Sequence, residues 1–369
     1  KLDKSTQSLT GIALQKFKRN FWGVFSFGFI VVLILLSIFA YVLAPDNSEN
    51  ANWGDLTIRS QKPGFEVQML SIPLKDEPQK SFWDFFFGSP QEFSKEPISR
   101  YKIAGEKLIY TLYNDDPKVM IQKEATLSDF PGYSNLEEVS KEYISTQKFY
   151  LGTDKAGRDY LSRMLVGSRV SISIGFVAVI ISLIVGIFFG AIGGYYGGKI
   201  DAFVMWLVNI IWSIPTLLLV IAITLSLGKG FWQVFVAVGL TMWVEVARVV
   251  RGQIISVKEM QYVTAAKALG YKNLRIIVHH ILPNIMAPVI VISAANFASA
   301  ILVESGLSFL GLGAQPPVPS WGGMIKDYYG DIILDKPYLA MVPGLAIMFL
   351  TLAFMMMGNA LRDALDVKN

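Results

Sequence analysis

Cysteine is absent from this 369-residue chain, histidine occurs twice, and only 17% of the residues are charged. Without cysteine, the chain cannot be a small secreted fold held together by disulfide bonds. The two histidines, His279 and His280, are adjacent and therefore fall on different faces of a helix, which argues against a metal site. Because a typical soluble domain has about 25% charged residues, the shortage of charge argues for a membrane protein.

Motifs for catalysis are lacking as well. The sequence contains no Gly-x-Ser-x-Gly, no His-Glu-x-x-His and no pair of carboxylates in an apolar run. Residues 193–199 have the glycine spacing of a phosphate-binding loop, but Ile200 stands where Ser or Thr would hold Mg²⁺. We interpret this segment as a glycine-rich turn. We therefore expect the chain to be no enzyme and to hold neither a cofactor nor a metal.

Charge is concentrated between residues 45 and 150. This segment holds 29 of the 62 Lys, Arg, Asp and Glu residues and 8 of the 16 prolines, and its net charge is −5. We expect a small α+β or irregular domain here, with a strand over 107–113 and a helix after Ser134. The aromatic run 82–87 is expected in a core or at a membrane interface, and a ligand-binding cage is the less favoured alternative.

Long runs without charge predict membrane spans, because a transmembrane helix needs about 20 mostly apolar residues. Four runs meet this length: 21–43, 170–198, 202–228 and 337–361. Two further runs are interrupted by charge, 231–250 by Glu245 and Arg248, and 287–312 by Glu304. The sequence therefore predicts an all-α polytopic membrane protein with six transmembrane helices.

Lys and Arg in the short loops predict the orientation. With the N-terminus inside, the inner side holds 14 of these bases and the outer loops hold three, Lys229, Lys326 and Lys336. This pattern is broken by Arg158, Arg163 and Arg169. Because these residues follow a long translocated segment, they have little influence on the orientation of the chain in the membrane. We expect cytoplasmic termini and an exported segment 45–150. The basic ends suit a membrane protein better than a nucleic-acid-binding protein.

Residues 257–285 lie on the predicted inner side. Thr264, Ala265 and Ala266 belong to a short helix with small side chains, and Gly270 ends it. Asn273 is placed to cap a second helix that stops at Pro283. Two interpretations remain open: an ordinary surface loop, or a docking surface that lets a cytoplasmic partner approach closely.

Three ordered motifs carry a resemblance to a known family. Residues 265–283 resemble the EAA-type coupling loop of ATP-binding-cassette (ABC) importer permeases. The matching positions are Ala265, Ala266, Gly270, His280, Leu282 and Pro283. Residues 280–284, 151–171 and 309–322 are similar to the oligopeptide, dipeptide and nickel branch, as is the ending 358–366. By this resemblance the chain is identified as a "C" type permease subunit.

The resemblance implies the type I ABC importer permease fold. It covers the first transmembrane helix, which with the N-terminus makes up 1–44, and a core permease domain with five helices (151–369). It does not cover the extracytoplasmic insert (45–150), which the charge distribution indicates and which is longer than the family's common form. It also implies a multi-pass protein of a bacterial cytoplasmic (inner) membrane that carries peptides. The implied partners are a homologous "B" type permease, an extracytoplasmic binding protein and two cytoplasmic ATPase subunits, which would bind ATP and Mg²⁺. Thr264 departs from the family, which often has Glu at this position.

Polar residues inside spans are candidates for the translocation pathway, because unpaired polar groups in hydrocarbon are costly. Glu304 is the first choice, followed by Asn296 and Asn209; the alternative for each is a hydrogen bond between helices. Other functions also stay open. The cargo could be nickel or another small solute, and the chain could be a membrane-anchored adaptor whose insert binds a ligand.

Overall fold

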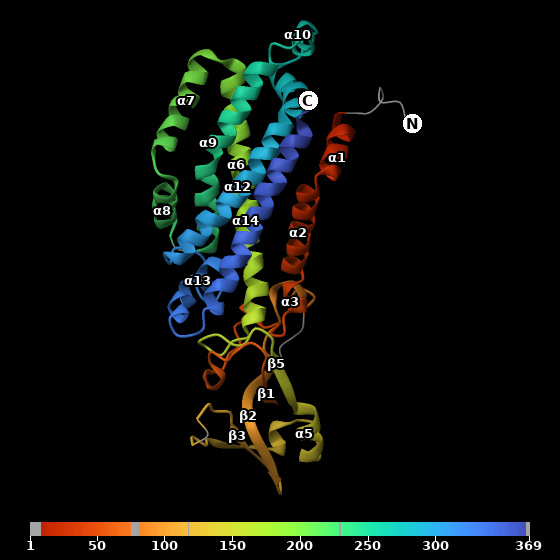
Figure 1. Cartoon of the computed structure of the whole chain (residues 1–369), viewed down its shortest axis with the longest axis vertical. Helices are drawn as coiled ribbons and strands as arrows, with labels where there is room; N and C mark the ends of the chain where they lie inside the picture. The colour runs from red at the N-terminus through yellow and green to blue at the C-terminus, as the bar shows by residue number, and fades with distance from the viewer. Residues whose placement is uncertain (1–8, 75–80, 117, 229, 367–369) are drawn as a thin grey trace, which may run out of the picture. The chain divides into compact units, whose positions relative to one another are not determined.

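The computed structural model describes residues 9–74, 81–116, 118–228 and 230–366, and it divides the chain into two compact units (Figure 1). The first, here called the helical unit, runs up to Leu35 and continues with Val170–Pro316 and from Ser320 onward. The second, the mixed unit, comprises Leu36–Arg169 with Pro317–Pro319. Four bases used for the predicted orientation, Lys1, Lys4, Lys229 and Lys368, lie outside the described residues.

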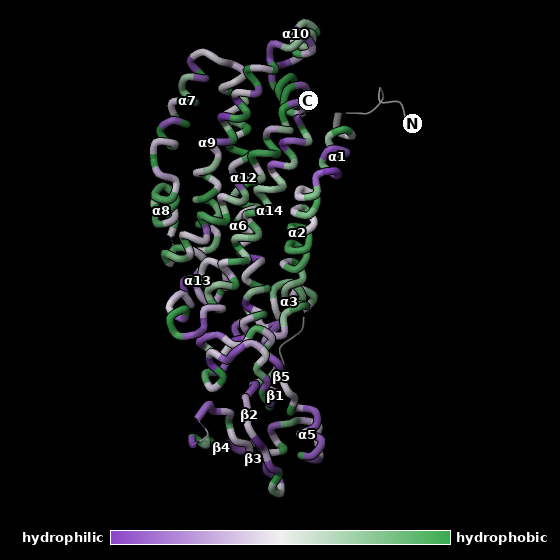
Figure 2. The backbone as a smooth tube through the Cα atoms, viewed as in Figure 1, coloured by the Kyte–Doolittle hydropathy of each residue, from purple (hydrophilic) through white to green (hydrophobic). Residues whose placement is uncertain are grey.

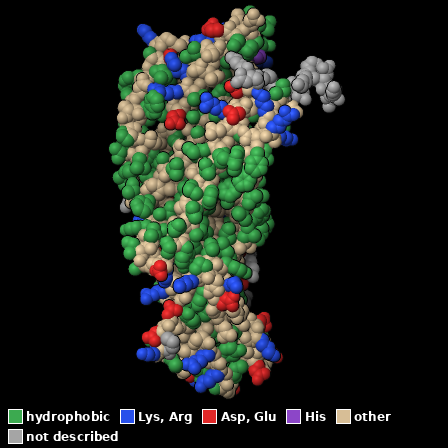
Figure 3. Space-filling model, viewed as in Figure 1, with side chains coloured by type: hydrophobic (Ala, Val, Ile, Leu, Met, Phe, Trp, Pro, Cys, Tyr) green, Lys and Arg blue, Asp and Glu red, His purple; other side chains and the backbone are tan. Residues whose placement is uncertain are grey.

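Long apolar helices build the helical unit, and two of them, α2 and α6, extend into the mixed unit. The helices are α1 (Leu9–Arg19), α2 (Phe21–Ile38), α6 (Tyr160–Tyr196), α7 (Gly198–Ser213), α8 (Thr216–Leu227), α9 (Phe231–Val257), α10 (Gln261–Ala268), α11 (Asn273–Arg275), α12 (Leu282–Phe309), α13 (Trp321–Tyr328) and α14 (Tyr338–Leu365). Hydrophobic residues dominate the long helices in Figure 2. In the face of the helical unit seen in Figure 3, hydrophobic side chains form a broad band, and Lys and Arg gather toward the end that carries α10.

Five helices among the described residues are long and apolar enough to cross a membrane. The pair α7 and α8 supplies a sixth span if it is counted as one, so the prediction of six is confirmed in that sense. The run 202–228, expected as a single span, is bent by 94° between the two helices. The bend falls at Pro215, which lacks an N–H and forces the preceding Ile214 into an extended conformation (φ −92°, ψ 129°).

Glycines let α6 and α9 approach closely. A Cβ on Gly186 would lie 2.5 Å from the Cβ of Val246, and one on Gly190 would lie 2.6 Å from the carbonyl oxygen of Ala247. Small residues at four-residue spacing are a common means of packing helices in membranes. The glycine-rich turn expected over 193–199 is shorter than predicted, because Gly193 and Gly194 belong to α6 and only Gly197 lies between α6 and α7.

The predicted helix end at Pro283 is wrong. The segments α11, a π-helical turn over Ile276–Ile281 and α12 form one helix, Asn273–Phe309, of 37 residues. In the π-helical turn the N–H of Leu282 bonds the carbonyl of Ile277, five residues back. This wider hydrogen-bond register accommodates Pro283, which has no N–H of its own, directly after the turn. Lys272 rather than Asn273 occupies the N-cap position.

The mixed unit contains an antiparallel sheet of five strands in the order β4-β3-β2-β1-β5. Its elements are α3 (Ala40–Leu43), β1 (Phe65–Pro73), α4 (Asp84–Phe87), β2 (Phe93–Ala104), β3 (Lys107–Leu112), β4 (Gln122–Thr126), α5 (Leu136–Tyr143) and β5 (Ile144–Phe149). The predicted strand over 107–113 and the helix after Ser134 are therefore confirmed. Leu136 and Val139 of α5 pack with Leu70, Ile98 and Leu108 of the sheet, so this unit has an apolar core of its own.

Candidate functional site

The short helix α10 has one buried side and one exposed side. Val263 and Ala266 are buried in an apolar cluster with Ile276 and Ile281 of the π-helical turn. Thr264 and Ala265 are exposed. Of the small residues that the sequence marks, Ala266 therefore anchors the helix, whereas Thr264 and Ala265 are available to a partner.

Gly270 ends α10 in a left-handed conformation, with φ +75°. Its N–H bonds the carbonyl of Lys267 at 3.0 Å, and the N–H of Tyr271 bonds the carbonyl of Ala266 at 3.2 Å. This pair of hydrogen bonds is a Schellman motif, in which glycine is favoured because a Cβ is strained at positive φ. The predicted helix end at Gly270 is confirmed, and the glycine fixes the direction in which the chain leaves α10.

A ring contact joins the segment after α10 to the π-helical turn, and an amide contact within the long helix lies beside it. The rings of Tyr271 and His280 stack with centroids 5.7 Å apart and an interplanar angle of 9°. The side-chain amide of Asn284 donates a 2.6 Å hydrogen bond to the carbonyl of His280. Leu282 is half-buried and Pro283 is exposed. The residues of the predicted coupling loop thus form one connected surface element.

Two exposed leucines at this element were not singled out from the sequence. Leu269 is 73% exposed and Leu274 is 72% exposed, on either side of the turn at Gly270. A signal was present, because a leucine directly before a helix-ending glycine has little helical surface on which to pack. Apolar side chains gathered at the tip of a loop mark an interaction surface, so these two residues join Thr264 and Ala265 as candidate contacts.

Glu304 is fully buried in α12 and lies beside other polar side chains. Its Oε1 accepts a 2.6 Å hydrogen bond from the hydroxyl of Ser308, which in turn lies 3.3 Å from the hydroxyl of Ser320. Within the described residues, its Oε2 has no hydrogen-bond partner. Asn296 is also buried in α12, and its Nδ2 likewise has no partner there. The role of both residues in the translocation pathway stays a prediction.

Asn209 is the exposed member of the three pathway candidates. Its Oδ1 accepts a 2.8 Å hydrogen bond from the guanidinium of Arg248, and that guanidinium also lies 3.4 Å from the ring centroid of Trp212. The contact joins the end of α7, just before the bend, to the middle of α9. Arg248, which interrupts the run 231–250, is therefore paired by an amide and a ring.

The motif 151–163 is held together by the buried carboxylate of Asp154. This group accepts hydrogen bonds from Arg158 Nε at 2.7 Å and from the backbone N–H of Ala156 at 2.8 Å, and Arg163 Nε lies 3.7 Å away. Two of the arginines that break the orientation pattern are thus neutralised locally. Burial raises the pKa of the nearby Asp159, against the lowering effect of its hydrogen bonds from Ser162. The motif has a structural role in the mixed unit.

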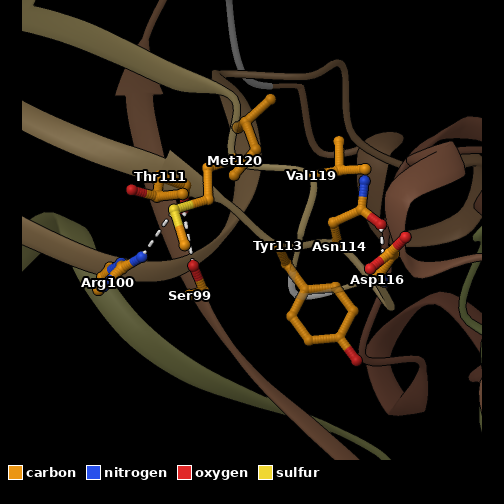
Figure 4. Close-up of a pocket in the computed structure, with 9 residues that line it drawn as sticks. Ser99, Arg100, Thr111, Tyr113, Asn114, Asp116, Val119 and Met120 are labelled. Atoms are coloured by element: carbon orange, nitrogen blue, oxygen red, sulfur yellow. Dashed lines mark hydrogen bonds between the residues drawn. The ribbon is translucent and has the colours of Figure 1, made fainter.

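A cavity of about 270 Å³ lies on the mixed unit beside β2 and β3 (Figure 4). Ser99, Arg100, Thr111 and Tyr113 line it, and Arg100 Nη2 lies 3.1 Å from the sulfur of Met120. Among the described residues that line it, the titratable side chains are those of Arg100, Tyr113 and Asp116. In the described part of the chain, no group of three or more His, Cys, Asp and Glu residues could hold a metal ion.

Apolar helices of spanning length, packed through glycines and joined by a compact surface loop, define a multi-pass helical membrane protein. Residues 169–368 match the family described as the binding-protein-dependent transport system inner membrane component. The chain belongs to this family of transport components. Residues 8–63 in addition match the N-terminal transmembrane domain of oligopeptide transport permease C.

Named relatives are similar over most of their length. A dipeptide transport system permease protein DppC of Alkalihalophilus pseudofirmus is 40% identical over 68% of this chain and 82% of the relative. An oligopeptide transport system permease protein OppC of Bacillus subtilis is 36% identical over 64% of this chain and 77% of the relative. Among solved structures, a chain of the inward-facing MetNI methionine ABC transporter has a TM-score of 0.46 at 15% identity, over 55% of this chain and 95% of that chain.

Proposed function

We propose that the chain is one permease subunit of an ATP-driven importer for peptides, with the type I permease fold. It forms the translocation pathway with a homologous second permease. The observation that carries this proposal is the compact loop 264–283, whose sequence resembles the site where the ATPase subunits dock. The names of the dipeptide and oligopeptide relatives support peptides as cargo.

The partners follow from the same proposal. Two cytoplasmic ATPase subunits bind ATP and Mg²⁺, and a binding protein on the other side of the membrane delivers the cargo. The loop 264–283 then faces the cytoplasm together with both termini. Three spans separate this loop from 45–150: α6, the pair α7 and α8 counted as one, and α9. An odd number of spans puts the insert on the opposite side of the membrane from the loop, so in this proposal the insert is exported.

The helix Asn273–Phe309 provides a route from the docking loop into the membrane. Its first turns carry Ile276 and Ile281, which pack with Ala266 of α10 and with Val250 of α9. A displacement of α10 by the ATPases therefore moves the beginning of this long helix and the end of α9 together. Because packed interiors shift as units, this movement reaches the part of the bundle that surrounds the pathway.

Docking is tested with one substitution made at two exposed alanines. Ala265→Trp adds bulk to the outward side of α10, and Ala104→Trp adds the same bulk at the end of β2 in the mixed unit. Both chains are produced with the second permease, the ATPase and the binding protein. Ala265→Trp should lose the ATPase subunits on purification and lose uptake of a labelled dipeptide, while Ala104→Trp should retain both. Intact complexes of Ala265→Trp with normal uptake would show that the loop does not dock the ATPases.

The cargo is tested with the unmodified complex in proteoliposomes. ATP-dependent accumulation of labelled di- and oligopeptides is compared with accumulation of Ni²⁺ alone and with a nickel chelate. Uptake of peptides that is unaffected by nickel supports the proposal. Uptake of nickel without peptide would instead assign a metal importer, and ligand binding by the isolated chain without any uptake would favour the adaptor.

A further inference from the structure

Three aromatic side chains at and before α4 are strongly exposed in the mixed unit. Phe82 is 78% exposed, and Trp83 and Phe87 are each 62% exposed. Their rings form a connected row, with centroids of Phe82 and Trp83 6.1 Å apart and those of Trp83 and Phe87 also 6.1 Å apart. Burial of one such side chain contributes roughly 1.5–3 kcal/mol, so a row of three exposed rings marks a surface that something covers.

The helix α4 lies against the end of the first membrane span. The helix α2 ends at Ile38, and α3 begins at Ala40 after a single residue, Phe39. The ring of Phe39 meets the ring of Phe85 edge to face, with centroids 6.2 Å apart. An 18-residue helix such as α2 is about 27 Å long, close to the thickness of the hydrocarbon core. The end of α2 is therefore where this span leaves the hydrocarbon.

A second span end contacts the same short helix. The guanidinium of Arg169 donates a hydrogen bond to the carbonyl of Phe86, and it lies 5.0 Å from the ring centroid of Tyr41 in α3. Arg169 directly precedes the charge-free run 170–198. The ends of two separate membrane spans thus lie beside α4.

We propose that Phe82, Trp83 and Phe87 insert into the boundary between headgroups and acyl chains in the leaflet next to the mixed unit. Aromatic rings, and Trp above all, are favoured at this depth, where an apolar body and a polar edge are both satisfied. The polar group of α4 stays out of the row, because Asp84 Oδ2 accepts a 2.8 Å hydrogen bond from the N–H of Ser81. Val42 and Leu43 of α3, each 50% exposed, add further apolar surface at the span end. The row thereby fixes the first span and the insert at the membrane surface.

The absence of cysteine makes the test direct. Phe82→Cys, Trp83→Cys and Phe87→Cys each receive one nitroxide label in the full transporter, whose other subunits are made cysteine-free, in phospholipid nanodiscs. Collision rates with O₂, which concentrates in lipid, and with a water-soluble Ni²⁺ chelate are measured by electron paramagnetic resonance. Val42→Cys serves as the span-end reference, and Glu106→Cys, in the β2–β3 turn, serves as the water reference.

The labels at 82, 83 and 87 should resemble the one at 42, with higher O₂ and lower Ni²⁺ accessibility than the one at 106. Ni²⁺ accessibility equal to that at 106 would place the row in water and overturn the proposal. Low accessibility to both reagents would show that a protein partner covers it, which also overturns the proposal. If the labelled variants do not assemble, a photoreactive benzoylphenylalanine at Phe87 replaces them. Phospholipid adducts are then expected, and adducts with another subunit alone would contradict the inference.

Discussion

The hydroxyl of Ser308 donates a 2.6 Å hydrogen bond to Oε1 of Glu304, one turn earlier in α12, and both side chains are buried. The nearby Ser320 is the N-cap of α13, where its hydroxyl accepts from the N–H of Gly323 at 3.1 Å. The acid in α12 is therefore connected through two hydroxyls to the start of α13. This arrangement explains how a span tolerates an acidic side chain.

A first prediction follows for Ser308→Ala. The substitution removes a hydrogen bond to a buried acceptor, which costs about 1–3 kcal/mol, so the melting temperature of the purified complex should fall. Glu304→Gln keeps an acceptor for the hydroxyl of Ser308, so the melting temperature of this variant should fall less. Complex yield and peptide uptake should decline together in both variants. Normal yield and melting temperature with lost uptake in Glu304→Gln would instead place Glu304 in contact with cargo.

A second prediction concerns the turn after α10. Gly270→Ala forces an L-residue to φ +75°, at a cost of roughly 1–2 kcal/mol, although an added Cβ would meet no atom within 4 Å. Gly252→Ala is the matched control, because its Cβ would also meet nothing within 4 Å and the residue lies inside α9. Binding-protein-stimulated ATP hydrolysis should fall for Gly270→Ala and stay unchanged for Gly252→Ala. Equal activities would show that the shape of this turn does not matter for coupling.

Which helices exist could be predicted from the sequence, because hydrocarbon admits few charges and the charge-free runs are long. How they bend could not. Pro215 and Pro283 give the same local signal for a helix end, yet the chain bends by 94° at the first and continues through the second. The difference is tertiary: Ile276 and Ile281 are buried against α9 and α10, and this packing holds the π-helical turn that accommodates Pro283.

The position of the candidate site in the chain could be predicted from the sequence. The direction in which its side chains face could not. Ala265 and Ala266 are about 100° apart on a helix, so one of them faces the bundle, but the sequence does not say which. The hydroxyl of Ser308, which bonds Glu304, also lies 3.3 Å from the hydroxyl of Ser320, a residue beyond the end of α12. A pattern within one span contains no information about such a neighbour.

A third prediction concerns the ion pair between α7 and α9. Both Arg251 Nε and Nη2 contact the carboxylate of Asp201, at 2.5 Å and 2.6 Å, and both side chains are partly exposed. Asp201→Asn, Arg251→Gln and the double variant form a cycle measured by thermal unfolding of the complex. We expect a coupling free energy of about 0.5–3 kcal/mol, as for residues in contact. Additive effects would show that the pair does not hold α7 to α9.

The last prediction concerns the sheet of the mixed unit. The N–H of Gly64 and the N–H of Gly152 both donate to the carbonyl of Phe149, at 2.9 Å and 3.0 Å, so the two ends of the sheet segment lie side by side. One contact that remains after excision does not involve the strands, because the hydroxyl of Thr153 accepts from the N–H of Gln61 at 2.8 Å. Ile58, in contrast, loses its packing against Val67, Met69 and Phe149. Joining Gly64 to Tyr150 therefore removes residues 65–149 with little strain.

The excised chain should insert and assemble with its partners in normal yield, since the apolar cores of the sheet and of the helical unit are separate. Its binding-protein-stimulated ATP hydrolysis in proteoliposomes should be weaker if, as we propose, this acidic module is exported and contacts the binding protein. The rate of ATP hydrolysis by the ATPase subunits in the absence of binding protein is the internal control and should not change. Full stimulation after excision would show that the module takes no part in delivery, whereas failure to assemble would show that the core helices need it to fold.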